Sequence, residues 1–109
     1  MSDYPNTWFR AILELDIGDT DREEFSRAWQ RMAVIVAQQP ANLMQSLNID
    51  AEQPSTAYIV SDWTDREHFR EFSSNPDHET QVAELKKLCR AVSMTQMHNI
   101  ITVAPASSK

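Results

Sequence analysis

The chain is poor in the residues that several classes of site require. Among its 109 residues there is one cysteine, Cys89, so neither a disulfide framework nor a cysteine-based metal site can form within the chain. There is also one glycine, Gly18, which leaves no glycine-rich loop for a nucleotide phosphate. The net charge is −6 and no basic stretch is present, which argues against a nucleic-acid partner.

Long hydrophobic runs are missing as well. No apolar stretch approaches membrane-spanning length, and the first residues have neither the basic nor the apolar region of a secretory signal. We therefore expect a cytoplasmic protein with no membrane partner. Apolar residues make up 41% and charged residues 24%, the balance of an ordinary globular domain. We predict one domain over residues 1–109, with an ordered core at about 8–103 and a flexible tail at 104–109.

One short pattern occurs twice. Thr20–Phe25 and Thr64–Phe69 agree at five of six positions, 44 residues apart, and each copy follows a strand-like run. Both have the form of a helix start, with a capping threonine and a glutamate three residues later. Two strand-helix-strand units of this size predict a βαββαβ order, the ferredoxin-like arrangement of an α+β protein with a four-stranded antiparallel sheet.

The spacing of apolar residues predicts the positions of the strands and helices. Alternating apolar residues predict strands, apolar spacings of three and four predict helices, and Gly18 suits a turn that needs a positive φ. Pro76 fits the first position of a helix that carries His78 on its apolar face. The predicted strands are 8–16, 42–50, 56–63 and 92–103, and the predicted helices run from Thr20 to before Pro40, from Thr64 to about Phe72, and from Pro76 to about Cys89.

The strands carry apolar residues on both alternations. Trp8 and Ile12 oppose Phe9 and Leu13 in the first strand, so the sheet face without helices would expose an apolar patch. A second copy of the sheet is the simplest cover. We therefore expect a homodimer.

Two segments carry a family resemblance. Ser61-Asp-Trp-Thr-Asp-Arg-Glu-His-Phe-Arg-Glu-Phe72, followed by Ser74-Asn-Pro-Asp-His78, resembles the antibiotic biosynthesis monooxygenase (ABM) family of dimeric α+β barrel proteins. Pro40-Ala-Asn-Leu43 is similar to the Pro-Gly-Phe segment with which that family enters its second strand. The resemblance implies the ferredoxin-like fold and a dimer.

The resemblance also implies a chemistry. Family members that oxidise polyketide anthrones to quinones use molecular oxygen without metal or flavin, because the deprotonated substrate itself supplies the electrons. In those members a tryptophan at the end of the third strand helps form the site, and Trp63 has that position here. Two other family positions, occupied there by hydrogen-bonding Asn and Tyr, hold Ile59 and Phe69. The haem-degrading branch fits less well, since its helical Trp and its haem-ligand His fall at Phe72 and Val82.

Each candidate residue has a structural interpretation beside the functional one. Trp63 is either a pocket wall or a core anchor. His78 lies in a first helical turn, where the positive helix end would lower its pKa and suit a general base; alternatively it is a partly exposed histidine beside Pro76. Arg10 either projects into a cavity or lies at the sheet rim. Ser61, two residues before Trp63, shares its side of the strand.

The sequence-based hypothesis is a cofactor-independent monooxygenase that acts on an aromatic polyketide in secondary metabolism. His78 and Trp63 are the predicted catalytic residues, and we expect no metal site, since His68 and His98 have no partner at ligand spacing. The alternatives are a non-oxidising, polyketide-binding accessory or cyclase-like protein, and a quinol- or aldehyde-handling stress protein of the same fold. Predicted substrate contacts are Arg10, Ser61, Ile59, Phe69, Phe72 and Trp29, while Met32, Met44, Met94 and Met97 are assigned to core filling and pocket lining.

Overall fold

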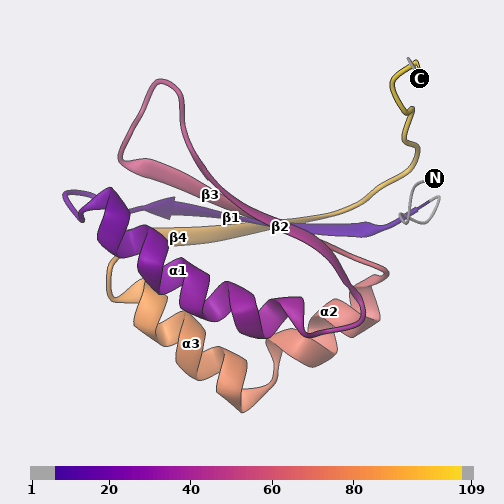
Figure 1. The fold of residues 1–109 in the computed structure, drawn as a ribbon, viewed down its shortest axis with the longest axis horizontal. Helices are drawn as coiled ribbons and strands as arrows, with labels where there is room; N and C mark the ends of the chain where they lie inside the picture. The colour runs from indigo at the N-terminus through magenta and orange to yellow at the C-terminus, as the bar shows by residue number, and fades with distance from the viewer. Residues whose placement is uncertain (1–6, 107–109) are drawn as a thin grey trace.

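The fold is one antiparallel sheet with three helices on one of its faces (Figure 1). The computed structural model describes residues 7–106. Within them the sheet has the order β2-β3-β1-β4, which is the ferredoxin-like topology predicted from the repeated unit. The elements are β1 (Phe9–Asp16), α1 (Arg22–Ala37), β2 (Asn42–Ile49), β3 (Thr56–Trp63), α2 (Arg66–Ser73), α3 (Pro76–Lys86) and β4 (Ala91–His98).

The helix starts lie one residue later than the capping-box pattern predicted. Asp21 and Asp65, not Thr20 and Thr64, are the N-caps, and their carboxylates accept from the backbone N–H groups of Glu24 and His68. A carboxylate at this position satisfies the free N–H groups and also interacts favourably with the helix dipole. The Thr20 hydroxyl instead donates to the backbone carbonyl of Leu88.

The last strand is shorter than predicted. β4 ends at His98, opposite Phe9 at the start of β1, so the chain beyond has no strand left to pair with. The predicted extension to Val103 is therefore wrong, because residue types alone indicate strand propensity but not whether a partner strand is present. Residues 99–106 form no helix or strand, and the expected flexible tail falls partly on 107–109, outside the described residues.

The core lies between the sheet and the helices. Alternate residues of β1 and β3 point toward the helix layer, and each helix buries the apolar face that its spacing predicted. Pro76 is the first residue of α3, as predicted, and the Asn75 side chain caps the helix by accepting from the backbone N–H of Asp77. The buried hydrophobic residues are Phe9, Ala11, Leu15, Ile17, Phe25, Met32, Val36, Ala57, Ile59, Trp63, Phe69, Phe72 and Leu85.

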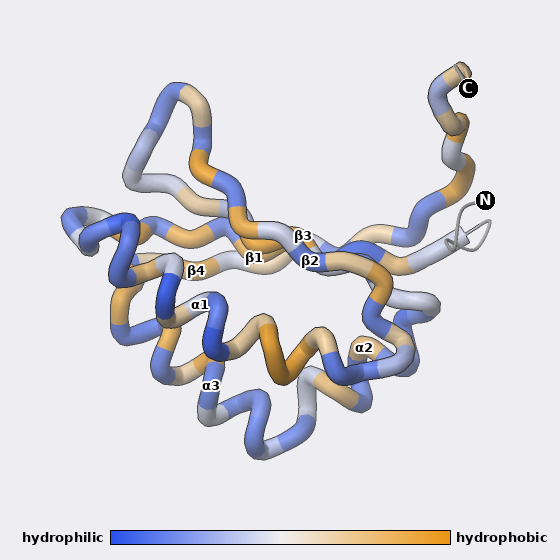
Figure 2. The backbone as a smooth tube through the Cα atoms, viewed as in Figure 1, coloured by the Kyte–Doolittle hydropathy of each residue, from blue (hydrophilic) through white to orange (hydrophobic). Residues whose placement is uncertain are grey.

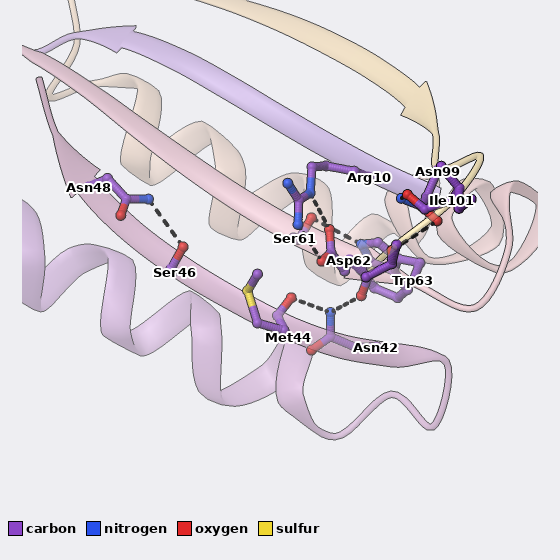
Figure 3. A network of polar contacts seen from close by, with 11 residues as sticks. Arg10, Asn42, Met44, Ser46, Asn48, Ser61, Asp62, Trp63, Asn99 and Ile101 are labelled. Atoms are coloured by element: carbon purple, nitrogen blue, oxygen red, sulfur yellow. Dashed lines mark hydrogen bonds and ion pairs between the residues drawn. The ribbon is translucent and has the colours of Figure 1, made fainter. Parts of the chain in front are cut away.

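The face without helices carries a buried ion pair. Arg10 of β1 donates from Nε and Nη2 to the two carboxylate oxygens of Asp62 on β3, at 2.7 and 2.8 Å (Figure 3). The Asp62 side chain has 0% exposure and that of Arg10 has 35%. The two residues lie in register on paired strands, so the bidentate geometry follows from the sheet itself.

Removing the cation should cost more than removing an ordinary surface arginine. Arg10→Met keeps a long apolar stem but leaves the Asp62 carboxylate buried without its guanidinium, and we expect a loss of about 3 kcal/mol in the free energy of unfolding. Arg31→Met, at an exposed site on α1, should change it by less than about 0.5 kcal/mol. Urea unfolding measures both, and equal effects would contradict the assignment of a stabilising pair.

Candidate functional site

A cavity of about 270 Å³ lies between the sheet and the helix layer. All four strands and all three helices contribute to its wall, and most of the contributing side chains are apolar. The cavity is therefore suited to an apolar ligand. Its lining consists of Ala11, Leu13, Met32, Val36, Gln45, Ile59, Ser61, Trp63, Phe69, Phe72, Ser73, His78, Val82, Lys86, Val92, Ser93 and Met94.

Aromatic rings form one end of this cavity. The Trp63 ring lies 5.7 Å from Phe69 and 5.4 Å from Phe72, measured between centroids, and Phe72 lies 4.3 Å from His78. The contacts join the end of β3 to α2 and to the first turn of α3. This arrangement fixes the indole and the imidazole at the same end of the cavity.

The Trp63 indole is held by a polar contact as well. Its Nε1–H donates to the Ser61 hydroxyl oxygen at 3.0 Å, and the ring is 2% exposed (Figure 3). The expectation that Ser61 shares the Trp63 side of the strand is therefore confirmed. Because the hydroxyl accepts this bond, its own proton remains to be donated to a further oxygen.

His78 has a ring nitrogen without a partner. Its Nδ1 is buried, and among the described residues no group forms a hydrogen bond to it. Burial lowers the pKa of His78 below its ordinary value of 6.5, against a smaller raising effect of Glu79. The direction is the one predicted from the sequence, but desolvation is its main cause. At neutral pH the imidazole is therefore uncharged and able to accept a proton.

Few other polar groups reach the cavity. Gln45 of β2 donates from its side-chain amide to the backbone carbonyl of Ala33 at 2.7 Å, which fixes the amide against α1. Ile59 and Phe69 both line the cavity with hydrocarbon side chains. They occupy the two positions that hold hydrogen-bonding Asn and Tyr in the family members described above. At the aromatic end of the cavity, Ser61 and His78 thus supply polar side chains, while Lys86 lies further along α3.

A second, more open hollow of about 440 Å³ lies on the outer side of Trp63 and Phe72. These two rings line both spaces, so they form the wall between them. His68 borders the outer hollow, and its exposed ring contacts Asp65 at 2.8 Å. This hydrogen bond raises the pKa of His68, in contrast to that of His78. The remaining lining residues are Gln39, Pro40, Ala41, Thr64, Glu71 and Asn75.

Two predicted substrate contacts lie elsewhere. Arg10 is on the opposite face of the sheet, bound to Asp62, and within residues 7–106 it does not line the inner cavity. Trp29 is half-buried on α1, packs against the core without lining the cavity, and has a buried Nε1 with no partner among the described residues. Neither residue lines the inner cavity, and their contact with a substrate stays a prediction. The strand alternation had placed Arg10 beside Trp8 and Ile12, and that face is the one without helices.

The sequence did not indicate Gln45, Lys86 and Ser93. Lys86 follows His78 by eight residues and Val82 by four, so helical spacing could have placed it on the cavity face. Gln45 and Ser93 carry no such signal, because a polar residue on an outer strand is ordinarily solvated. Of the methionines, Met32 and Met94 do line the cavity.

The described part of the chain offers neither a cluster of metal ligands nor a membrane-spanning helix. Within residues 7–106, no cluster of three His, Cys, Asp or Glu side chains has an arrangement suited to a metal ion. None of the helices in the same range combines the length and the apolar character needed to span a bilayer.

Known proteins share this fold. The structure of an alanine variant of SnoaB from Streptomyces nogalater, described as a cofactor-independent oxygenase, superposes with a TM-score of 0.72 and 17% identity over 96% of this chain and 100% of that one. Protein SO0527 from Shewanella oneidensis superposes with a TM-score of 0.76 and 12% identity, over 90% and 96% of the two chains. At such identities the likeness concerns the fold alone.

Sequence comparison identifies the family. Protein SchA of Streptomyces halstedii is 30% identical over 81 residues, which are 74% of this chain and 21% of SchA, so the chain spans about a fifth of that relative. The family profile named Antibiotic biosynthesis monooxygenase matches residues 9–84, more than half of the chain. The protein therefore belongs to the antibiotic biosynthesis monooxygenase family.

Proposed function

We propose that the protein is a cofactor-independent oxygenase that converts an anthrone-type aromatic polyketide to a quinone. The observation that carries the proposal is the buried, unpartnered Nδ1 of His78, in a cavity whose same end is formed by Trp63 and Phe72. Family membership and the fold shared with SnoaB support it.

The reaction needs a base and a dry site. Removal of one proton from the anthrone methylene gives a carbanion delocalised over the rings, which can pass one electron to dioxygen. Recombination of the resulting radical with superoxide forms a carbon–oxygen bond, and the proton returns to give a hydroperoxide. Loss of water leaves the quinone carbonyl, so one CH₂ group and one O₂ give one C=O group and one water. The apolar lining would keep bulk water from the carbanion.

His78 is the base in this proposal. A desolvated imidazole is neutral at pH 7, and its position in the first turn of α3 adds the positive helix end to the effect of burial. A base of this kind contributes roughly 10²- to 10⁴-fold to a rate. The Phe72 ring against the imidazole limits its rotation.

Ser61 would stabilise the substrate oxygen on which negative charge develops. Its hydroxyl is fixed by the bond from the Trp63 indole and retains a proton to donate. The Trp63 ring itself would pack against the flat substrate. This assignment replaces Arg10, which the sequence had offered as an alternative to Ser61.

A second function is favoured by the hydrocarbon side chains of Ile59 and Phe69. With fewer donors in the cavity, the protein could bind a polyketide as an accessory or cyclase-like protein without oxidising it. Binding without oxygen consumption is the feature that separates the two functions.

We also propose that the protein acts as a homodimer. Five of the six exposed large hydrophobic side chains lie in residues 94–103: Met94, Met97, Ile100, Ile101 and Val103. Figure 2 shows hydrophobic positions along the stretch that leads away from β4 toward the C-terminus. Exposed apolar side chains clustered in this way are typical of an interface with another copy.

Oxygen uptake with dithranol, a dihydroxyanthrone, tests the oxygenase proposal. The wild type should consume oxygen well above the buffer rate, and His78→Gln should reduce kcat by about 10²-fold or more because the base is lost. His68→Gln, which changes a histidine of the outer hollow, should retain the wild-type rate. Binding of dithranol without uptake above buffer would reject the oxygenase proposal in favour of the accessory function.

The pH dependence of the same reaction tests the state of His78. The base works when neutral, so the rate should be present above the pKa of His78 and be lost as the pH falls through it. Since burial lowers that pKa, the loss should occur below pH 6.5. NMR titration should place the His78 midpoint below that of His68. A rate that instead falls through a pKa above 6.5 would exclude His78 as the base.

Sedimentation or light scattering tests the dimer. The wild type should have twice the 12.5 kDa mass of one chain. Changing Ile100 and Ile101 together to aspartate should shift the protein toward monomer, because charges would enter an apolar interface. Val34→Asp on α1, at a site 62% exposed, should leave the dimer intact. A monomeric wild type would refute the proposal.

A further inference from the structure

We propose that Lys86 makes the inner cavity selective for anionic aromatic ligands and fixes their orientation, with the acidic substituent at Lys86 and the opposite ring edge at Trp63 and His78. The inference rests on the proposed role of this cavity as the ligand site. It does not require that the bound ligand be oxidised.

The cavity is elongated, and Lys86 lies at the end remote from the aromatic rings. His78, Val82 and Lys86 all line it and follow one another at four-residue spacing on α3, so His78 and Lys86 are separated by about 12 Å along the helix. The sheet gives the same length. Trp63 pairs with Phe9 at one end. Ile59, four residues earlier on β3, pairs with Leu13, which in turn pairs with Met94, so the two levels lie about 13 Å apart along the strands.

Lys86 is also the one cavity-lining side chain, within residues 7–106, that carries a full charge at neutral pH. The His78 imidazole is neutral there, and the other lining side chains are apolar or uncharged. No ion pair between Lys86 and a described carboxylate is present, whereas its neighbour Lys87 contacts Glu84 at 3.0 Å. Lys86 is exposed at the cavity wall, where its ammonium is available to a ligand anion.

The charge of the whole chain strengthens the argument. A net charge of −6 disfavours the approach of an anion, so a ligand with a carboxylate or phenolate needs a local cation to bind. Lys86 is the cation that the cavity lining provides. A flat aromatic acid would place its anionic group here and its rings toward Phe72 and Trp63, which leaves the remote ring edge facing the imidazole.

Two anthraquinones test this directly. Rhein and aloe-emodin share their ring system and differ in one substituent, a carboxylate in rhein and a hydroxymethyl group in aloe-emodin. Their Kd values can be measured from quenching of tryptophan fluorescence. The wild type should bind rhein about tenfold more tightly, the effect of one charge-assisted hydrogen bond.

The variants locate the effect. Lys86→Met should weaken rhein about tenfold and leave aloe-emodin within about twofold, while Lys86→Arg should retain the preference. Lys87→Met, the same change one residue later, should keep the wild-type preference. Equal affinities for both ligands in the wild type, an undiminished preference in Lys86→Met, or failure of both ligands to bind would overturn the proposal. Selectivity without oxygen uptake from dithranol would uphold it and reject the oxygenase function alone.

Discussion

The burial of the Trp63 indole at the end of β3 is the constraint on which the site depends. The ring is held by its hydrogen bond to Ser61 and by Phe69 and Phe72, so a single side chain ties the sheet to α2. It also separates the inner cavity from the outer hollow, since both are lined by Trp63 and Phe72. The contacts of Trp63 thus form the wall of the apolar cavity and also stabilise the core. A smaller residue at this position would join the two spaces.

Much of this arrangement could be predicted from local sequence. The bounds of β3, the positive φ of Gly18 and the start of α3 at Pro76 follow from alternation, turn chemistry and proline preference, which are properties of short segments. Features that depend on distant partners could not be predicted in the same way. β4 ends where β1 gives it no further partner, and the partner of Arg10 is Asp62, 52 residues along the chain.

The site could also be predicted only in part, because local spacing identifies buried faces but not which of them meet. The spacing of Phe69, Phe72 and His78 placed them on buried helix faces, and the structure brings them to the end of β3. Trp29 has the same apolar spacing on α1, but it lies outside the cavity, because periodicity selects a face and not a position along it. At Ile59 and Phe69 the cavity has hydrocarbon, which makes it drier and assigns recognition of a ligand oxygen to fewer groups. With hydrocarbon at those two positions, the imidazole of His78, kept neutral by burial, is one of the few polar groups that could act on a ligand there.

A crystal structure with rhein bound would test the central claim most directly, namely that the space between sheet and helices is the ligand site. We predict the ring system in the inner cavity, in contact with Trp63 and within hydrogen-bonding distance of the His78 Nδ1 or the Ser61 hydroxyl. Rhein bound instead in the outer hollow beside His68 and Glu71, with the inner cavity closed by its own side chains, would contradict the account.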